Sequence, residues 1–425
     1  MEKGGEMSIT RRNFLKIGGL SISTFGLTDV LFSTQKEAFQ PKLSNLASEV
    51  KPLTPEDFQK RLGKAQKLMA EHKIDGLFLT GSTNLVYFTN VNWGRSERIF
   101  GAVLNRKGYP IWVCPAFERK RAEERIPKGH EIRTWEEDES PYKLIAGIMK
   151  DIGARNGCLA LGPTVRSFVL YGLGKDGSHL KLVNGAPVTE GCRGIKTEKE
   201  IAYMDLANKI TKIAYQEGLK HLQQGMSAPE LSDVISQTHQ KMGVRGGGWP
   251  QFGPNSAFPH GSSVMRHLHP GDIVLVDGGC SVEGLRSDVT RTVIFGKPSD
   301  RQRKIWEIVR KAQSNALKAV CPGVACESID LVARQVIEEA GYGPGYKYFS
   351  HRLGHGIGME GHEYPYLVRG NKLKLQPGMT FSNEPGIYIY DEFGVRIEDC
   401  FVVTEDGGRF LGGMEAISIE RPFGE

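Results

Sequence analysis

The sequence predicts two folded domains: an α/β domain of alternating strands and helices, then an α+β domain in which helices precede strands. The chain has 425 residues, enough for two or three domains of usual size. Apolar residues make up 39% and charged residues 24%, which excludes a disordered or fibrous chain. Strand and helix signals alternate up to about residue 185, whereas glycine-punctuated strands follow from residue 272 to the end.

The charge and the cysteines exclude several classes of function. The formal net charge of +6 is small for this length and no block of Lys or Arg accompanies it, so we expect no nucleic-acid partner. The seven cysteines are an odd number, which argues against a disulfide framework. None of them forms the CxxC pair of a zinc ribbon.

Residues 1–33 are interpreted as an export signal. Arg11-Arg12, followed by Phe14-Leu15-Lys16 and a mildly apolar run, resembles a twin-arginine signal. The run carries Asp29 and is too short and too polar to predict a membrane span. The alternative is an ordinary amphipathic N-terminal helix. The export interpretation predicts the twin-arginine translocase as a partner and a periplasmic or extracellular location, and it leaves an N-terminal membrane anchor open.

The first domain is expected at residues 54–189, after a polar linker at residues 34–53. Thr54-Pro55-Glu56-Asp57 supplies a helix N-cap, a proline at the first helical position and an acid two residues after it, which predicts a helix to about residue 72. A short apolar strand at residues 76–80 follows, and then a loop and another apolar run.

The second domain is expected at residues 190–425. Thr197 and Glu200 form a second capping signal at the start of a helix. The apolar residues behind it recur at helical spacing: Ile201, Met204, Ile210, Ile213 and Ala214.

Strand-like segments of the second domain carry acidic residues in apolar company. These residues are Asp277, Asp288, Glu384 and Glu398, and a glycine-rich HGIG segment adds His355. Each residue alone has an ordinary explanation, because acids often cap turns and histidines often bond within cores. Buried carboxylates are costly, however, and pairing with a divalent metal offsets that cost. Four carboxylates and one imidazole suit two divalent ions, which can share a water and lower its pKa.

The motifs that carry these five residues are VDGG, SDVTRT, GHGIG, NEPGIYI and VRIED. In this order they resemble the creatinase/aminopeptidase P/prolidase family of metallopeptidases, family M24, over roughly residues 55–420. A weaker resemblance to the family's first domain surrounds residues 84–90. The resemblance implies a creatinase-type N-terminal α/β domain followed by a C-terminal pita-bread α+β metallopeptidase domain.

The resemblance also implies a role for each of the five residues. Asp277 would chelate one ion, His355 and Glu384 would hold the other, and Asp288 and Glu398 would bridge both. The ions would be two divalent metals, manganese in the first place and cobalt, zinc or iron as alternatives. The implied mechanism is attack of a metal-activated hydroxide on the scissile carbonyl, with Glu384 carrying the proton.

The implied activity is that of a metallo-exopeptidase. Such an enzyme hydrolyses Xaa-Pro bonds at peptide N-termini, as an aminopeptidase P or as a prolidase (an Xaa-Pro dipeptidase). The resemblance further implies proline-containing peptides as substrates and a homodimer as the assembly.

Four further residues are candidate catalytic or substrate-binding groups. His260 and His362 stand at the positions of the family's substrate-side histidines, where they would hold the substrate carbonyl and the tetrahedral intermediate. Arg396 would either pair with Asp277 or bind a substrate carboxylate. Tyr388 would either stabilise an oxygen or pack in the core.

Two other classes of function remain to be weighed. A non-peptidase pita-bread enzyme, either a creatinase-like hydrolase or a metal-dependent lyase, would use the same scaffold. The intact ligand set argues against the metal-free creatinase reaction, and His362 argues against the lyase. A binding module built on an inactive catalytic domain would have lost ligands, whereas all five are present.

Overall fold

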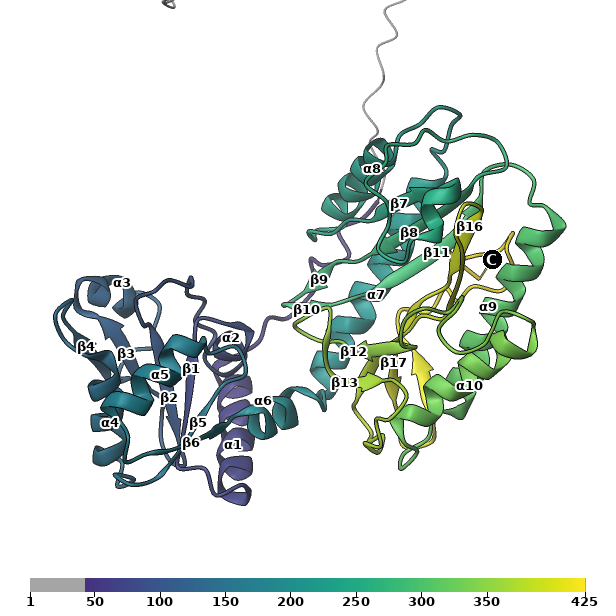
Figure 1. The fold of residues 1–425 in the computed structure, drawn as a ribbon. Helices are drawn as coiled ribbons and strands as arrows, with labels where there is room; N and C mark the ends of the chain where they lie inside the picture. The colour runs from purple at the N-terminus through teal and green to yellow at the C-terminus, as the bar shows by residue number, and fades with distance from the viewer. Residues whose placement is uncertain (1–42, 425) are drawn as a thin grey trace, which may run out of the picture. The chain divides into compact units, whose positions relative to one another are not determined.

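The computed structural model describes residues 43–424, and Figure 1 shows their fold. The predicted export signal at residues 1–33 and the first part of the predicted linker lie outside the described residues. Within residues 43–424, none of the helices combines the length and the apolar character that crossing a membrane requires.

A six-stranded sheet forms the centre of the first domain, with strand order β4-β3-β2-β1-β5-β6. Strands β1, β2 and β3 are antiparallel neighbours, and β4, β5 and β6 each join a parallel neighbour. The strands are β1 (Gly76–Thr80), β2 (Gly101–Asn105), β3 (Ile111–Pro115), β4 (Ile132–Trp135), β5 (Cys158–Leu161) and β6 (Lys181–Asn184). The helices are α1 (Pro55–Glu71), α2 (Thr83–Thr89), η1 (Ala116–Glu118), α3 (Arg119–Glu123), α4 (Pro141–Asp151), α5 (Ser167–Asp176) and α6 (Ala186–Arg193).

Local capping explains where the first helices begin. Helix α1 starts at the capping box of Thr54 and Asp57, as the sequence predicts. A hydrogen bond from Lys199 and one from the Thr54 backbone lower the pKa of Asp57 to about 2. The hydroxyl of Ser82 accepts a hydrogen bond from the backbone N–H of Leu85, so the second apolar run forms helix α2.

Residues 43–53, within the predicted linker, pack against the core of the second domain. Leu43, Leu46, Ala47, Val50 and Leu53 are partly buried there. The backbone N–H of Ala47 donates to the carbonyl of Met242, and the hydroxyl of Tyr203 donates to the carbonyl of Lys51. This segment therefore contacts the second domain before the chain enters the first.

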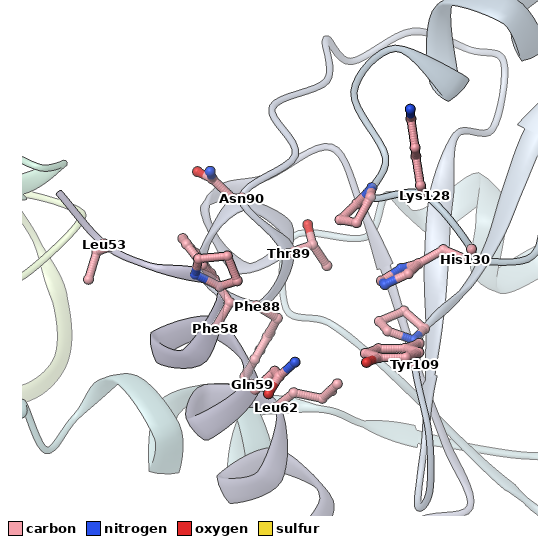
Figure 2. Close-up of a pocket in the computed structure, with 14 residues that line it drawn as sticks. Leu53, Phe58, Gln59, Leu62, Phe88, Thr89, Asn90, Tyr109, Lys128 and His130 are labelled. Atoms are coloured by element: carbon pink, nitrogen blue, oxygen red, sulfur yellow. The ribbon is translucent and has the colours of Figure 1, made fainter.

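Figure 2 shows a cavity of about 370 Å³ in the first domain. Phe58 and Leu62 of α1 line it together with Phe88 of α2, and Tyr109 and His130 complete an aromatic wall. The rings of Tyr109 and His130 stack with centroids 4.5 Å apart. None of the five candidate metal ligands lines this cavity.

The second domain combines helices with small antiparallel sheets. Its sheets have the orders β11-β8-β7 and β13-β12-β14-β17-β18, with two-stranded pairs β15-β16 and β9-β10. The helices are α7 (Glu198–Leu219), α8 (Ala228–Lys241), η2 (Gly253–Ala257), α9 (Asp300–Ala319) and α10 (Cys326–Glu339). The strands are β7 (Trp249–Phe252), β8 (Ile273–Gly278), β9 (Ser281–Val282), β10 (Leu285–Arg286), β11 (Val289–Ile294), β12 (Gly354–Gly356), β13 (Glu363–Leu367), β14 (Thr380–Asn383), β15 (Gly386–Ile389), β16 (Phe393–Arg396), β17 (Asp399–Val403) and β18 (Gly408–Phe410).

Helix α7 begins at the capping box of Thr197 and Glu200, as the sequence predicts. The expectation of strands alone after residue 272 is wrong, because helices α9 and α10 lie between β11 and β12 and pack side by side (Figure 1). Capping boxes also open two helices that the sequence did not mark: Ser227 and Glu230 open α8, and Ser299 and Gln302 open α9.

Charged side chains connect the end of α6 with strand β13. Arg193 pairs with Glu360 and Glu363, and Lys196 pairs with Glu363 at 2.9 Å. Burial opposes ionisation of Glu363, but the charges of Lys196 and Arg193 outweigh it and lower its pKa.

Candidate metal centre

The register of two antiparallel strands places the first carboxylates. Asp277 of β8 lies opposite Thr290 of β11, and the backbone N–H of Glu398 donates to the carbonyl of Thr290. The Thr290 hydroxyl is 3.0 Å from Asp277 Oδ1 and 2.6 Å from Glu398 Oε2. Since a hydroxyl has one proton, it can donate to only one of these carboxylates at a time.

A close backbone approach holds Asp288 beside this pair. A Cβ on Gly279 would lie 2.1 Å from the carbonyl oxygen of Ser287, so only glycine permits the contact. Burial and the negative charge of Asp277 raise the pKa of Asp288 well above its usual range. Burial and the charges of Asp288 and Glu384 raise the pKa of Glu398 in the same way. The carboxylates repel one another, and a cation among them would remove that repulsion.

His355 and Glu384 form the other side of the cluster. His355 Nε2 lies 3.2 Å from Glu384 Oε1 and 3.8 Å from Asp288 Oδ2. The Nδ1 atom of His355 lies 3.1 Å from the carbonyl of Gly356, which fixes the ring orientation. Burial opposes ionisation of Glu384, but the hydrogen bond from His355 and the charge of that imidazole lower the pKa of Glu384 to about 2.

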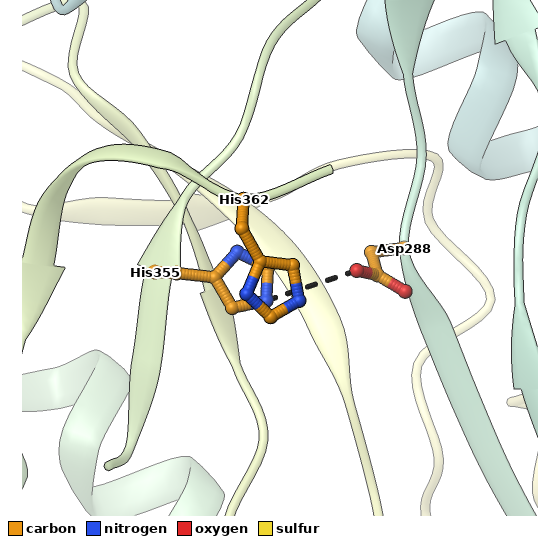
Figure 3. Close-up of side chains that lie close together, drawn as sticks. All are labelled: Asp288, His355 and His362. Carbon is orange, nitrogen blue, oxygen red and sulfur yellow. Dashed lines mark ion pairs between the residues drawn. The ribbon is translucent and has the colours of Figure 1, made fainter. Parts of the chain in front are cut away.

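Figure 3 shows His362 stacked on His355, with ring centroids 3.6 Å apart and planes 14° from parallel. The dashed line in Figure 3 joins His355 to Asp288. Burial and the neighbouring charge of His355 lower the pKa of His362 to about 4, so its imidazole is neutral near pH 7. His362 is exposed on its other side and can reach a substrate from there.

Arg396 and Tyr388 lie in a buried cluster beside the carboxylates. The sequence leaves two roles open for Arg396, and its NH2 group donates to Asp277 Oδ2 at 2.7 Å. The other guanidinium nitrogens donate to Thr290, to the carbonyl of Pro259 and to the hydroxyl of Tyr388. All three nitrogens of Arg396 are therefore engaged by the protein, which fits pairing with Asp277.

The hydroxyl of Tyr388 lies 2.7 Å from His351 Nε2. His351 Nδ1 is 2.8 Å from the carbonyl of Arg352, so Nδ1 carries the proton and Nε2 accepts from Tyr388. Burial raises the pKa of Tyr388 to about 12, so its phenol keeps its proton at neutral pH. Tyr388 therefore holds His351 and receives a hydrogen bond from Arg396.

His260 is exposed and lies three residues after the end of η2. It forms no hydrogen bond within residues 43–424. The pKa of His362 responds to His260, so the two histidines are within electrostatic range of each other. Both imidazoles are accordingly free to meet a substrate.

A buried ion network behind the site was not found by the sequence reasoning. Asp399 lies 2.7 Å from both Lys212 of α7 and Arg291 of β11. Arg291 also donates to the backbone carbonyls of Thr290 and Glu398. The network thus holds the backbone of Thr290 and Glu398 in place beside the site.

Tyr215 of α7 also lies near the site, and the sequence did not mark it as a candidate. Its phenol is fully buried, and its hydroxyl has no hydrogen-bond partner within the described part of the chain. Burial and the charges of Asp277 and Asp288 raise its pKa. The helical spacing from Thr211 to Tyr215 on the buried face of α7 was the available signal.

The donor atoms meet in overlapping groups that could hold metal ions. One group is Asp277, Asp288 and Glu398, and another is His355, Glu384 and Glu398; within each, the ligand atoms lie within 4.8 Å of one another. A third group joins His362 to Asp288 and His355. Carboxylate oxygens with one or two imidazole nitrogens suit first-row divalent metals, so the side chains fit the group that the resemblance implies.

An α/β domain joined to an α+β domain that gathers carboxylates and histidines defines the class of two-domain proteins with a candidate metal centre. Comparison with known proteins specifies that class. Residues 61–195 match the creatinase/prolidase N-terminal domain, and residues 202–405 match metallopeptidase family M24.

Individual relatives agree with these matches. An Xaa-Pro dipeptidase of Lactobacillus helveticus is 36% identical over 352 residues, which cover 81% of this chain and 95% of the relative. The solved dipeptidase PepE from Mycobacterium ulcerans superimposes with a TM-score of 0.79 at 31% identity, over 85% of this chain and 96% of that one. The solved prolidase from Thermococcus sibiricus superimposes with a TM-score of 0.75 at 33% identity, over 83% of this chain and 96% of that one.

The chain therefore belongs to metallopeptidase family M24. The predicted fold is confirmed: a creatinase N-terminal domain precedes a pita-bread catalytic domain. The protein is a hydrolase of the peptidase type, and the family's dependence on divalent metals agrees with the acidic and histidine groups described above.

Proposed function

We propose that this protein is a dinuclear metallo-exopeptidase that hydrolyses Xaa-Pro bonds at peptide N-termini. The observation that carries the proposal is the convergence of Asp277, Asp288, His355, Glu384 and Glu398 into two groups that share Glu398. These five side chains would hold two divalent ions, manganese in the first place and cobalt, zinc or iron as alternatives. Asp288 and Glu398 would bridge, since a carboxylate can offer one oxygen to each ion.

When bound, the ions would lower the pKa of a shared water toward neutrality and polarise the scissile carbonyl. Glu384 is the group placed to take the proton of that water, because part of its carboxylate remains open to the site while His355 and Ser382 hold it. It would then pass the proton to the leaving nitrogen.

The two free histidines would bind the substrate. The neutral ring of His362, fixed by stacking on His355, would donate a hydrogen bond to the substrate carbonyl. His260 would add a second donor from the opposite loop. Tyr388 and Arg396, which hold each other and Asp277, would keep this wall of the site rigid.

The preference for proline is supported by the relatives that are named Xaa-Pro dipeptidase and prolidase. An imide nitrogen has no hydrogen, so peptidases that need the amide N–H bind this bond poorly. Between an aminopeptidase P and a prolidase, the names of these relatives favour the dipeptidase.

One experiment tests this function. Manganese-loaded, cobalt-loaded and metal-free protein would be incubated with Ala-Pro, Ala-Pro-Ala and Ala-Ala-Ala, and the products separated by chromatography. We expect metal-dependent release of alanine from the proline peptides and little from the control. Equal turnover of Ala-Ala-Ala would refute the proline preference, and the ratio of Ala-Pro to Ala-Pro-Ala separates dipeptidase from aminopeptidase.

We also propose that the protein is exported by the twin-arginine translocase to the periplasm or the exterior, and that it acts as a homodimer. Arg11-Arg12 motivates the export proposal. A reporter fused behind residues 1–45 should leave the cytoplasm only in cells that possess the translocase. Transport that continues without the translocase would refute export by this route.

A further inference from the structure

A groove of about 470 Å³ opens beside Asp288 in the second domain. Helix α8 contributes Ser232 and Ser236, and the glycine run 246–248 leads into Trp249 at the start of β7. Arg245 and Arg286 line it as well. Because the groove reaches Asp288, a substrate bound at the carboxylates can extend into it.

Bare backbone forms part of the groove wall. A Cβ on Gly248 would lie 2.7 Å from Val276 Cγ1, and one on Gly278 would lie 2.8 Å from the carbonyl of Gly247. These positions have no room for a side chain directed inward. The absence of side chains along this stretch lets a ligand approach the backbone closely.

Apart from Asp288, the charged side chains that line the groove are positive. Its charged lining residues are Arg245, Arg286 and Asp288, and Asp288 is already assigned to the metal centre. Both arginines are exposed. Arg286 donates from Nε to the carbonyl of Met359, and within residues 43–424 neither guanidinium has an ion-pair partner. Two unpaired guanidinium groups favour an anionic ligand.

Of the five candidate metal ligands, only Asp288 lines the groove. Glu384, which would protonate the leaving proline nitrogen, does not line it, whereas Asp288 does. With the proposed proton path, the leaving proline would lie toward Glu384, which places the residue on the acyl side toward Asp288 and the groove. This step rests on the proposed function, because it uses the proton path given there.

We propose that Arg245 and Arg286 form a subsite for an acidic side chain on the residue that precedes proline, so that Glu-Pro and Asp-Pro are preferred substrates. Trp249, which is 70% exposed, contacts the aliphatic part of that side chain. The two arginines determine specificity and take no part in bond cleavage.

The test compares kcat/KM for Glu-Pro, its uncharged isostere Gln-Pro, and Lys-Pro, with Ala-Pro as the reference. We expect Glu-Pro to exceed Gln-Pro by roughly three- to tenfold, the range of one or two exposed ion pairs, and Lys-Pro to be the poorest. Arg245→Gln combined with Arg286→Gln should bring the ratio of Glu-Pro to Gln-Pro close to one while Ala-Pro turnover stays as it was. Arg301→Gln, a charge removed from an exposed position outside the groove, is the matched control and should leave the ratio unchanged.

Binding to the metal-free protein gives a second readout. Quenching of Trp249 fluorescence by Glu-Pro and by Gln-Pro would be titrated, with Trp249→Phe to identify the signal. Tighter binding of Glu-Pro that disappears in the double variant supports the subsite even if Ala-Pro is not cleaved, an outcome that would refute only the proposed function. Equal kcat/KM and equal affinity for Glu-Pro and Gln-Pro in the wild type would overturn the subsite, whatever the activity toward Ala-Pro.

Discussion

Replacing Asp399 by asparagine should destabilise the catalytic domain strongly. Asp399 is fully buried and faces two buried cations, Arg291 and Lys212, each at 2.7 Å. Removing one partner of a buried ion pair costs about 3–5 kcal/mol, because the other charge is left uncompensated. Arg291 keeps hydrogen bonds to backbone carbonyls and Lys212 keeps those to Leu411 and Gly413. We therefore expect the free energy of unfolding to fall by about 3 kcal/mol, at the lower end of this range.

Urea unfolding at pH 7, followed by circular dichroism, measures this loss, with Asp406→Asn in an exposed turn as the matched control. Burial opposes ionisation of Asp399, but Arg291 and Lys212 outweigh it and lower its pKa. Because the pKa of Asp399 is lower in the folded state than in the unfolded state, its ionised form stabilises the fold at pH values above the unfolded pKa of about 4. This stabilisation is lost as the pH falls through the pKa of the folded state. The difference in free energy of unfolding between wild type and Asp399→Asn should therefore become smaller below about pH 4. A difference under about 1 kcal/mol at pH 7 would refute the reasoning.

Three further predictions concern the site and the connection between the domains. Asp288→Ala and Glu398→Ala should each abolish turnover, whereas His362→Ala should lower kcat by roughly 10²-fold; near-normal activity in either bridging variant would contradict the assignment. Tyr215→Phe removes a hydroxyl with no partner in the described residues, so it should change the free energy of unfolding by less than about 1 kcal/mol. Urea unfolding measures this change, and a loss well above about 1 kcal/mol would contradict the absence of a hydrogen bond within the described residues. Arg193→Gln should destabilise by about 1–3 kcal/mol in thermal unfolding, because Lys196 is then the one ion-pair partner of Glu363 among the described residues; the exposed Arg119→Gln is its control, and equal midpoints would count against the pairing.

The features that the sequence predicted well are local. The capping boxes at Thr54 and Thr197 need only residues three positions apart, so the starts of α1 and α7 could be read directly. The boxes at Ser227 and Ser299 have the same form, so the starts of α8 and α9 are equally local features.

The features that the sequence did not predict depend on distant partners. Lys212 interrupts the apolar spacing of α7, and nothing nearby indicates that it is buried, since Asp399 belongs to strand β17. The apolar side chains of residues 43–53 likewise pack against α7 and α8, which follow an entire domain later. The five candidate ligands could be named because each lies in a distinctive short motif, and the structure brings their donor atoms together. Their roles as ligands stay a prediction.

The most direct test of the account counts the metal ions. Protein loaded with manganese and freed of excess would be analysed by inductively coupled plasma mass spectrometry against protein concentration, for wild type and for Glu398→Gln. Because Glu398 belongs to both ligand groups, we predict about two ions per chain in the wild type and fewer than one in the variant. A wild-type chain that binds no manganese, cobalt, zinc or iron, or a variant that retains both ions, would contradict the claim that these side chains enclose a dinuclear centre.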